Sequence, residues 1–122
     1  MSRFYDVRGH LGCEFGDLDK IRNIVDAYVD RGEEFGLSDR IAQLYSSGWL
    51  YQQREINWVA HAFFGASVKA GGVDLVRHQI ENIARLVTGI EGIFFVDDDE
   101  GERSECWKVT GGRLEVFNRK GL

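Results

Sequence analysis

Apolar and polar residues alternate over several short stretches of the chain, and a period of two residues predicts β-strands. In the first stretch, Tyr5, Val7 and Leu11 fall on one face. Aromatic and β-branched residues are frequent in the later stretches, as is typical of strands. Gly111 and Gly112 separate the last two stretches and favour a tight hairpin. The predicted strands are residues 3–11, 49–53, 56–64, 93–96, 106–109 and 113–117.

Other segments repeat apolar residues every three or four positions, which predicts amphipathic helices. The first of them carries Leu18, Ile21 and Val25 at this spacing, behind Asp17 as a suitable N-cap. A short helix is predicted after Ser38, and the last helix follows the glycine pair Gly71–Gly72. The predicted helices are residues 17–30, a short helix capped by Ser38, and residues 73–87.

The chain twice places a strand with an internal glycine before a helix, first in residues 5–28 and again in residues 60–86. Together with the other strands, this order predicts an α+β fold. We expect a two-layer sandwich, with a mostly antiparallel sheet and helices on one face. The expected detail is ferredoxin-like β-α-β units with a pseudo-twofold repeat and a C-terminal hairpin.

Composition limits the classes of protein to which the chain can belong. Its 122 residues, 43% of them apolar, fit one domain spanning residues 1–122. No apolar run approaches the ~18–20 residues that cross a bilayer, and the first residues have no apolar signal segment, so we expect a cytoplasmic protein. The net charge of −5 argues against nucleic acid as a partner and is compatible with a basic protein.

Five carboxylates gather in six residues near the end of the chain, as Asp97, Asp98, Asp99, Glu100 and Glu102. The spacing does not match a calcium-binding EF-hand loop. Such a run is either a solvated hairpin loop or a negative patch that receives Lys and Arg side chains of a partner.

Aromatic side chains beside a negative patch would anchor a partner. Trp49 and Tyr51 are the candidate anchors, with Trp49 equally suited to the core. For Trp58 and Trp107 we expect core packing.

The chain contains few residues in patterns typical of catalysis or metal binding. Cys13 and Cys106 are expected to be reduced, buried thiols, and His10-x-x-Cys13 has no second half with zinc spacing. We therefore expect no metal, no cofactor and no enzymatic activity. His10 and His61 hold similar positions in the two repeats, so they either face one another as an acid–base pair or match by accident.

In outline the chain resembles the immunity proteins of bacterial toxin systems. The resemblance rests on the repeated strand–loop–helix unit, on Glu91-Gly-Ile-Phe-Phe-Val-Asp97, and on Trp107 followed by Gly112-Arg-Leu-Glu-Val. It implies an inhibitor that binds and neutralises a cognate toxin, for example a nuclease with a basic cleft. The run from Asp97 to Glu102 would then steer the toxin, with Trp49 and Tyr51 as anchors.

The alternative is a homodimeric, ferredoxin-like small-molecule-binding domain or small enzyme. Its pocket would lie between sheet and helices and would be lined by Arg8, His10 and His61. This hypothesis predicts a dimer that buries the sheet face.

Overall fold

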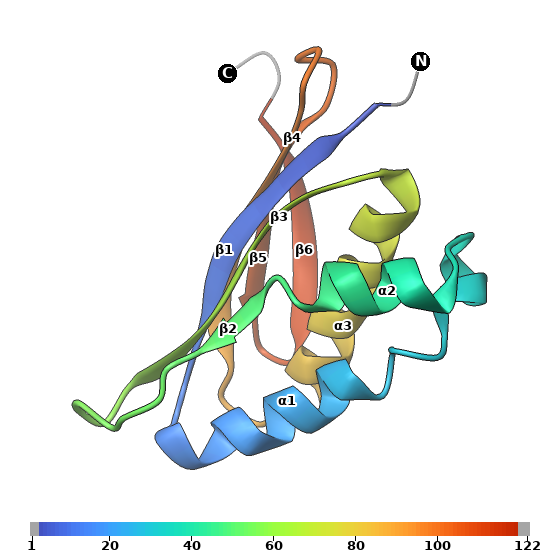
Figure 1. The fold of residues 1–122 in the computed structure, drawn as a ribbon. Coiled ribbons are helices and arrows are strands. Elements are labelled where there is room, and N and C mark those ends of the chain that lie inside the picture. The colour runs from blue at the N-terminus through green and yellow to red at the C-terminus, as the bar shows by residue number, and fades with distance from the viewer. Residues whose placement is uncertain (1–2, 120–122) are drawn as a thin grey trace.

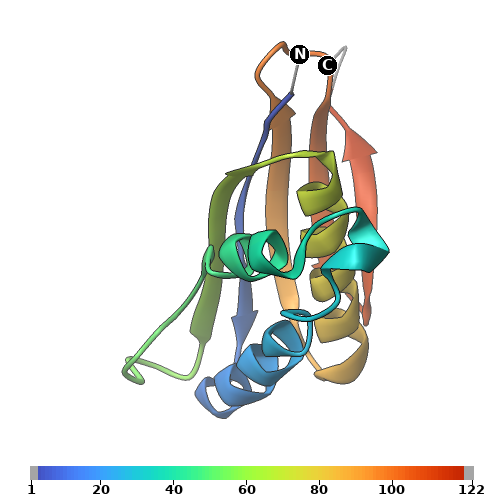
Figure 2. The ribbon, with the colours of Figure 1, turned by 45° about the vertical axis from the view of Figure 1, so that its right-hand side comes forward.

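The computed structural model describes residues 3–119 as one antiparallel sheet covered on one face by helices (Figures 1 and 2). This arrangement confirms the predicted α+β two-layer sandwich and its C-terminal hairpin. Short 3₁₀ helices at Phe15–Asp17 and Gly32–Phe35 connect the larger elements. The larger elements are β1 (Tyr5–Cys13), α1 (Leu18–Asp26), α2 (Asp39–Ser46), β2 (Trp49–Tyr51), β3 (Ala60–Val68), α3 (Ala70–Leu86), β4 (Glu91–Asp98), β5 (Ser104–Thr110) and β6 (Arg113–Asn118).

The strands lie in the order β2-β3-β1-β4-β5-β6, and all neighbouring pairs are antiparallel. The first strand of the chain is therefore central, between β3 and β4. The ferredoxin-like character and the pseudo-twofold repeat stay predictions from the sequence. Within the described residues, no helix combines the length and apolar character that crossing a membrane requires.

The core lies between the sheet and the helices. Alternate residues of the strands point to this side, and Val7, Phe64 and Phe94 are almost completely buried there. α3 contributes a stripe of apolar residues that includes Ile80 and Ile83, both without exposed surface. The opposite side chains of each strand consequently form an open face of the sheet that carries no helix.

Among the strands, the largest error of the sequence pattern concerns β3, which occupies residues 60–68 rather than 56–64, whereas β1 begins only two residues later than predicted. Gln52 explains the shift. Its backbone N–H donates to the carbonyl oxygen of His61, and its side-chain oxygen accepts from the N–H of the same residue. The Gln52 amide nitrogen also donates to the carbonyl oxygen of Arg54. The Gln52 side chain thus takes the place of the next backbone hydrogen bond between β2 and β3. Residues 52–59 form a longer connection than the few residues between the predicted strands 49–53 and 56–64.

The third helix begins at Ala70, three residues before the predicted start. Gly71 and Gly72 lie inside its first turn rather than ending a strand. A Cβ atom at Gly72 would lie 2.6 Å from the ring of Tyr45. These glycines therefore permit close packing of α3.

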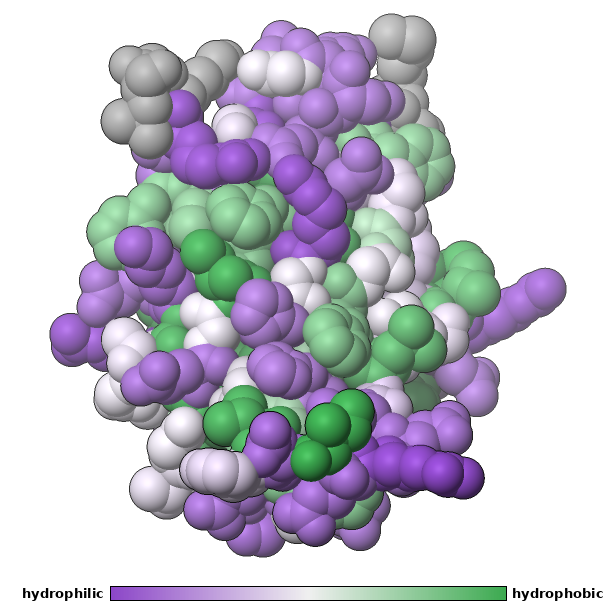
Figure 3. All heavy atoms as spheres, turned by 90° about the vertical axis from the view of Figure 1, so that its left-hand side faces the viewer, coloured by the Kyte–Doolittle hydropathy of each residue, from purple (hydrophilic) through white to green (hydrophobic). Residues whose placement is uncertain are grey.

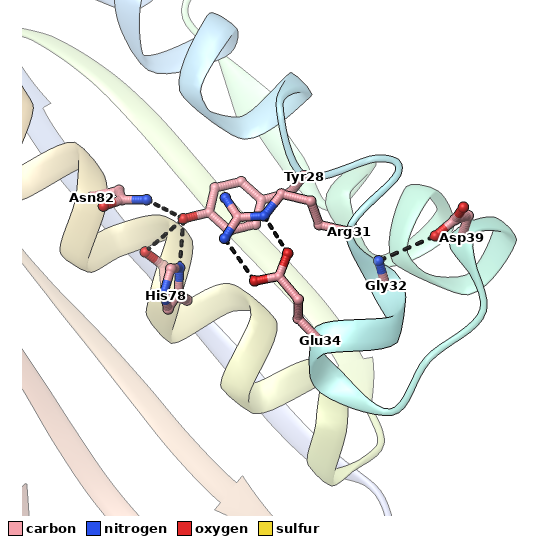
Figure 4. Close-up of polar contacts among 7 residues, drawn as sticks. All are labelled: Tyr28, Arg31, Gly32, Glu34, Asp39, His78 and Asn82. Atoms are coloured by element: carbon pink, nitrogen blue, oxygen red, sulfur yellow. Dashed lines mark hydrogen bonds and ion pairs between the residues drawn. The ribbon is translucent and has the colours of Figure 1, made fainter.

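A buried tyrosine fixes the segment between α1 and α2 to α3 (Figure 4). The Tyr28 hydroxyl group lies 2.6 Å from Nδ1 of His78 and accepts a hydrogen bond from the amide of Asn82. Arg31 covers the tyrosine ring and forms paired hydrogen bonds with Glu34. Burial raises the pKa of Tyr28, so the hydroxyl group keeps its proton at neutral pH.

Candidate functional site

The predicted acidic patch is largely neutralised by neighbouring arginines. Asp97 and Asp98 are the last residues of β4 and not loop residues. Arg8 Nη1 lies 2.9 Å from one oxygen of Asp97, and Arg119 Nη2 contacts both. Asp98 accepts a hydrogen bond from the backbone N–H of Arg103, which holds the pKa of its carboxyl below the ordinary value. Both carboxylates are therefore engaged within the molecule.

The rest of the acidic run surrounds Arg3. The Arg3 guanidinium lies 2.6 Å from Glu100, 3.0 Å from Glu102 and 3.5 Å from Asp98. Asp99 is exposed at the turn that follows β4. The guanidinium of Arg3 offsets much of the negative field expected here from sequence.

The two aromatic residues predicted as anchors do not stand at this patch. Trp49 is 4% exposed, and its indole N–H donates to the side-chain oxygen of Gln79 at 2.9 Å in the core. Tyr51 is half-buried beneath the guanidinium of Arg22, and burial raises its pKa to about 12. Figure 1 places β2 far from the turn after β4 that holds Asp99. The structure thus keeps the predicted acids and the predicted anchors apart.

The exposed tryptophan of this protein is Trp58, for which core packing was the wrong prediction. Its side chain is 82% exposed, and Ile56 beside it is 79% exposed. Both belong to residues 52–59, named here the hairpin tip, which projects beyond the sheet (Figure 1). Trp107 is fully buried, as predicted. The alternation of apolar residues continues through the hairpin tip, so periodicity alone could not separate Trp58 from the strand. The polar residues 52–55 and Asn57 were the available signals of a connecting loop.

A hollow of about 650 Å³ lies beside the hairpin tip. We name it the end groove. The start of the first helix, the end of α3 and the hairpin tip form its walls. Trp58, Val59 and Leu86 supply exposed apolar surface, and three carboxylates supply charge. Its lining residues are Gly12, Cys13, Glu14, Asp17, Lys20, Trp58, Val59, Leu86, Val87, Thr88, Gly89 and Glu91.

The end groove has a negative field. Glu14, Asp17 and Glu91 face a single cation, Lys20, whose Nζ lies 3.4 Å from Asp17. Burial raises the pKa of the nearby Cys13 thiol to about 11, and the Asp17 and Glu14 carboxylates add to the shift. Within residues 3–119, Glu14 and Glu91 form no ion pair.

Most of the excess charge of the chain lies in the segment that begins at the end groove. Residues 14–40 contain eight acidic and four basic side chains, a net charge of −4 out of −5 for the whole chain. Asp26, Asp30 and Glu33 of this segment are exposed and form no ion pair with another described residue. The first helix and the segment after it therefore carry three exposed carboxylates that form no ion pair with another described residue.

The two histidines, whose proximity the sequence left open, are neighbours because β1 pairs with β3. The rings of His10 and His61 lie 5.6 Å apart, and the ring of Phe63 stacks on His61. They line a shallow hollow of about 430 Å³ on the open face of the sheet, together with Lys108. The expected position between sheet and helices is wrong, because both side chains point away from the helices. Arg8 does not line this hollow and instead binds Asp97.

Figure 3 views the open face of the sheet, where apolar side chains lie among polar ones in the middle and lower parts. Leu50 and Phe63 contribute to it and are 66% and 46% exposed. They come from β2 and β3, the strands that the hairpin tip connects. The exposed apolar surface therefore continues from the hairpin tip onto this face.

Both cysteines are free and buried. Among the described residues, no three His, Cys, Asp or Glu side chains are grouped to hold a metal ion. Comparisons of the chain with protein-family models, curated proteins and solved structures found no match. The chain's own surfaces are therefore the basis for assigning a function.

Proposed function

We propose that this protein is a binding inhibitor of another protein, of the kind represented by bacterial immunity proteins, and that it neutralises a toxin with a basic surface. One observation carries the proposal: Trp58 and Ile56 stand almost fully exposed beside a groove lined by carboxylates. This contact surface differs from the one that the sequence suggested, since Trp58 replaces Trp49 as the anchor.

Exposed apolar side chains of this size favour a protein partner. Single exposed apolar residues are ordinary, but contiguous ones mark interaction sites. Here Ile56, Trp58 and Val59 are consecutive or nearly so, and Leu50 and Phe63 extend the surface onto the sheet. Tryptophan is also the residue type that most often dominates the energy of protein interfaces.

The charge near the hairpin tip favours a basic partner. Two of the three groove carboxylates, Glu14 and Asp17, belong to residues 14–40, the segment that also carries exposed acids. Complementary charge raises the association rate and selects among partners more than it increases affinity. A cationic, substrate-binding surface of a toxin, such as that of a nuclease, fits this pattern.

Capture from a lysate of the source cells tests the proposal. Tagged wild-type protein, Trp58→Ala and Leu44→Ala serve as baits, and the bound material is identified by mass spectrometry. Leu44 is the matched control, since it is an exposed leucine of α2 that lines neither hollow. Loss of a hot-spot tryptophan costs about 2 kcal/mol or more, which corresponds to roughly 30-fold in affinity.

The proposal expects one stoichiometric partner with wild-type protein and with Leu44→Ala, and much less of it with Trp58→Ala. The purified partner should lose its activity when the wild-type protein is added. Equal capture by all three baits would reject the hairpin tip as the contact surface. A captured enzyme that stays fully active would reject the inhibitor function.

A second candidate function rests on the His10–His61 pair. Two imidazoles 5.6 Å apart beside Lys108 line an open hollow in which a small anionic molecule could be held or protonated. This candidate also expects a homodimer that covers the open face. Native mass spectrometry of purified protein tests it: a dimer with a bound small molecule supports it, and a bare monomer contradicts it.

A further inference from the structure

We infer that the end groove receives a basic side chain of the protein partner, whose hydrocarbon part lies against Trp58 and whose charged group meets Glu14 and Glu91. This inference rests on the proposed function, because it assumes that the ligand is a protein. It adds the chemistry by which the partner is recognised at this place.

The apolar wall of the end groove suits the stem of a long basic side chain. Trp58, Val59 and Leu86 are 82%, 54% and 57% exposed, so a bound side chain would cover surface that now faces water. Lysine and arginine carry three or four methylene groups that pack on such surface while their charged ends stay near polar groups. The face of an indole ring also attracts a cation directly.

Two of the three groove carboxylates have no ion-pair partner among the described residues. Lys20 is engaged with Asp17, whereas Glu14 and Glu91 form no ion pair with another described residue. An apolar ligand would cover these carboxylates without compensating them, which costs free energy. A cation supplies the missing charge, so charge complementarity selects a basic occupant over a neutral one.

The end of α3 adds to the same field. Leu86, the last residue of this 17-residue helix, lines the groove together with Val87. The C-terminal end of a helix carries partial negative charge and favours cations. The start of the first helix, which favours anions, already has Asp17 and Asp19 at its first turn. The raised pKa of Cys13 agrees with a negative field in the groove.

Nuclear magnetic resonance of the full ¹⁵N-labelled chain tests the inference without knowledge of the partner. The probe is a capped Leu-Arg-Leu peptide, and its control is the same peptide with citrulline, a neutral isostere of arginine. The inference expects shifts of the Trp58 indole signal and of the amides near Glu14 and Glu91 with the arginine peptide. The citrulline peptide should bind several-fold more weakly.

Variants identify the groups that bind the probe. Trp58→Ala and the pair of Glu14→Gln and Glu91→Gln should each weaken binding of the arginine peptide, by about 2- to 5-fold per lost contact. The pair of Asp30→Asn and Glu33→Gln removes the same two charges from exposed positions outside the groove and should leave binding unchanged. The folded state of each variant is checked from its amide spectrum.

Equal binding of both peptides, or shifts centred on Asp26, Asp30 and Glu33, would overturn the inference. The proposed function fails separately. If a captured partner requires Trp58 but is insensitive to Glu14→Gln with Glu91→Gln, the inhibitor function stands and the basic side chain is excluded. If no protein partner is captured, the proposed function is rejected, whatever the result of the peptide experiment.

Discussion

A glycine at position 9 allows the central strand to lie close to its neighbour. A Cβ atom at this position would overlap the carbonyl oxygen of Ile93 and lie 2.6 Å from Cα of Phe94. Both atoms belong to the backbone of β4, which cannot move aside without breaking the pairing with β1. The residue type is therefore fixed by the packing of two paired strands.

We predict that Gly9→Ala lowers the free energy of unfolding by about 2–3 kcal/mol, since overpacking forces backbone shifts. Gly65→Ala is the control, because Gly65 lies opposite Arg8 in the same sheet and has open space where its Cβ would stand. The control should change stability by less than about 0.5 kcal/mol. Urea denaturation of both variants measures the difference, and equal effects would contradict this account of Gly9.

Also at the residue level, the pKa of Cys13 depends on burial and on the carboxylates of the end groove. Burial raises its pKa from 9.0 to about 11, with smaller contributions from Asp17 and Glu14. The thiolate is the reactive form. The native protein should therefore react slowly with iodoacetamide at pH 9 and faster as the pH approaches 11. Because the folded state then holds a proton that the unfolded state releases, stability should fall as the pH rises above 9.

The variant Cys106→Ser isolates the reaction of Cys13. Adding Glu14→Gln removes one of the charges that raise the Cys13 pKa, so the pH profile of alkylation should move to lower pH. A profile that stays in place would show that burial alone sets the pKa.

At the scale of elements, a single hydroxyl group links the segment after α1 to α3. The hydroxyl group of Tyr28 meets His78 and Asn82, one turn apart on α3, as Figure 4 shows. Together with Leu18, Ile21 and Val25, which α1 buries in the core, this contact holds the acidic segment of residues 14–40 against the rest of the molecule. The exposed carboxylates of that segment thus keep a fixed position relative to the end groove.

Tyr28→Phe should lower the free energy of unfolding by about 1 kcal/mol, the usual net value of a lost hydrogen bond. Tyr51→Phe is the matched control, because the buried hydroxyl group of Tyr51 has no hydrogen-bond partner among the described residues. That control should be neutral or slightly stabilising. Urea denaturation compares the two, and a larger loss for Tyr51→Phe would contradict the assigned role of Tyr28.

The sequence predicts elements well where packing alone determines them. The buried stripe of α3 and the Gly111–Gly112 turn follow from apolar spacing and backbone preference. The hairpin tip was missed, because its apolar residues continue the alternation of β3 although they face solvent. The arginines that neutralise Asp97 and Asp98 were also missed. Arg3 and Arg8 are up to 95 residues away along the chain and meet the acids through the pairing of β1 and β4, whereas Arg119 directly follows β6.

At the scale of the whole molecule, the two ends of the sandwich differ in charge and surface. Arginines compensate the acids at the end of β4. The end with the hairpin tip instead combines exposed apolar surface with two carboxylates, Glu14 and Glu91, that form no ion pair within residues 3–119. A partner gains both apolar burial and charge compensation at the latter end. The end with the hairpin tip and the end groove is therefore the proposed binding surface.

Hydrogen–deuterium exchange of the full chain, alone and with the captured partner, tests this claim most directly. With the partner bound, we predict slower exchange in residues 52–59, 12–17 and 86–91. Exchange at α2 and at the turn after β4 should change little. Protection centred on the run from Asp97 to Glu102, with unchanged exchange at the hairpin tip, would contradict it.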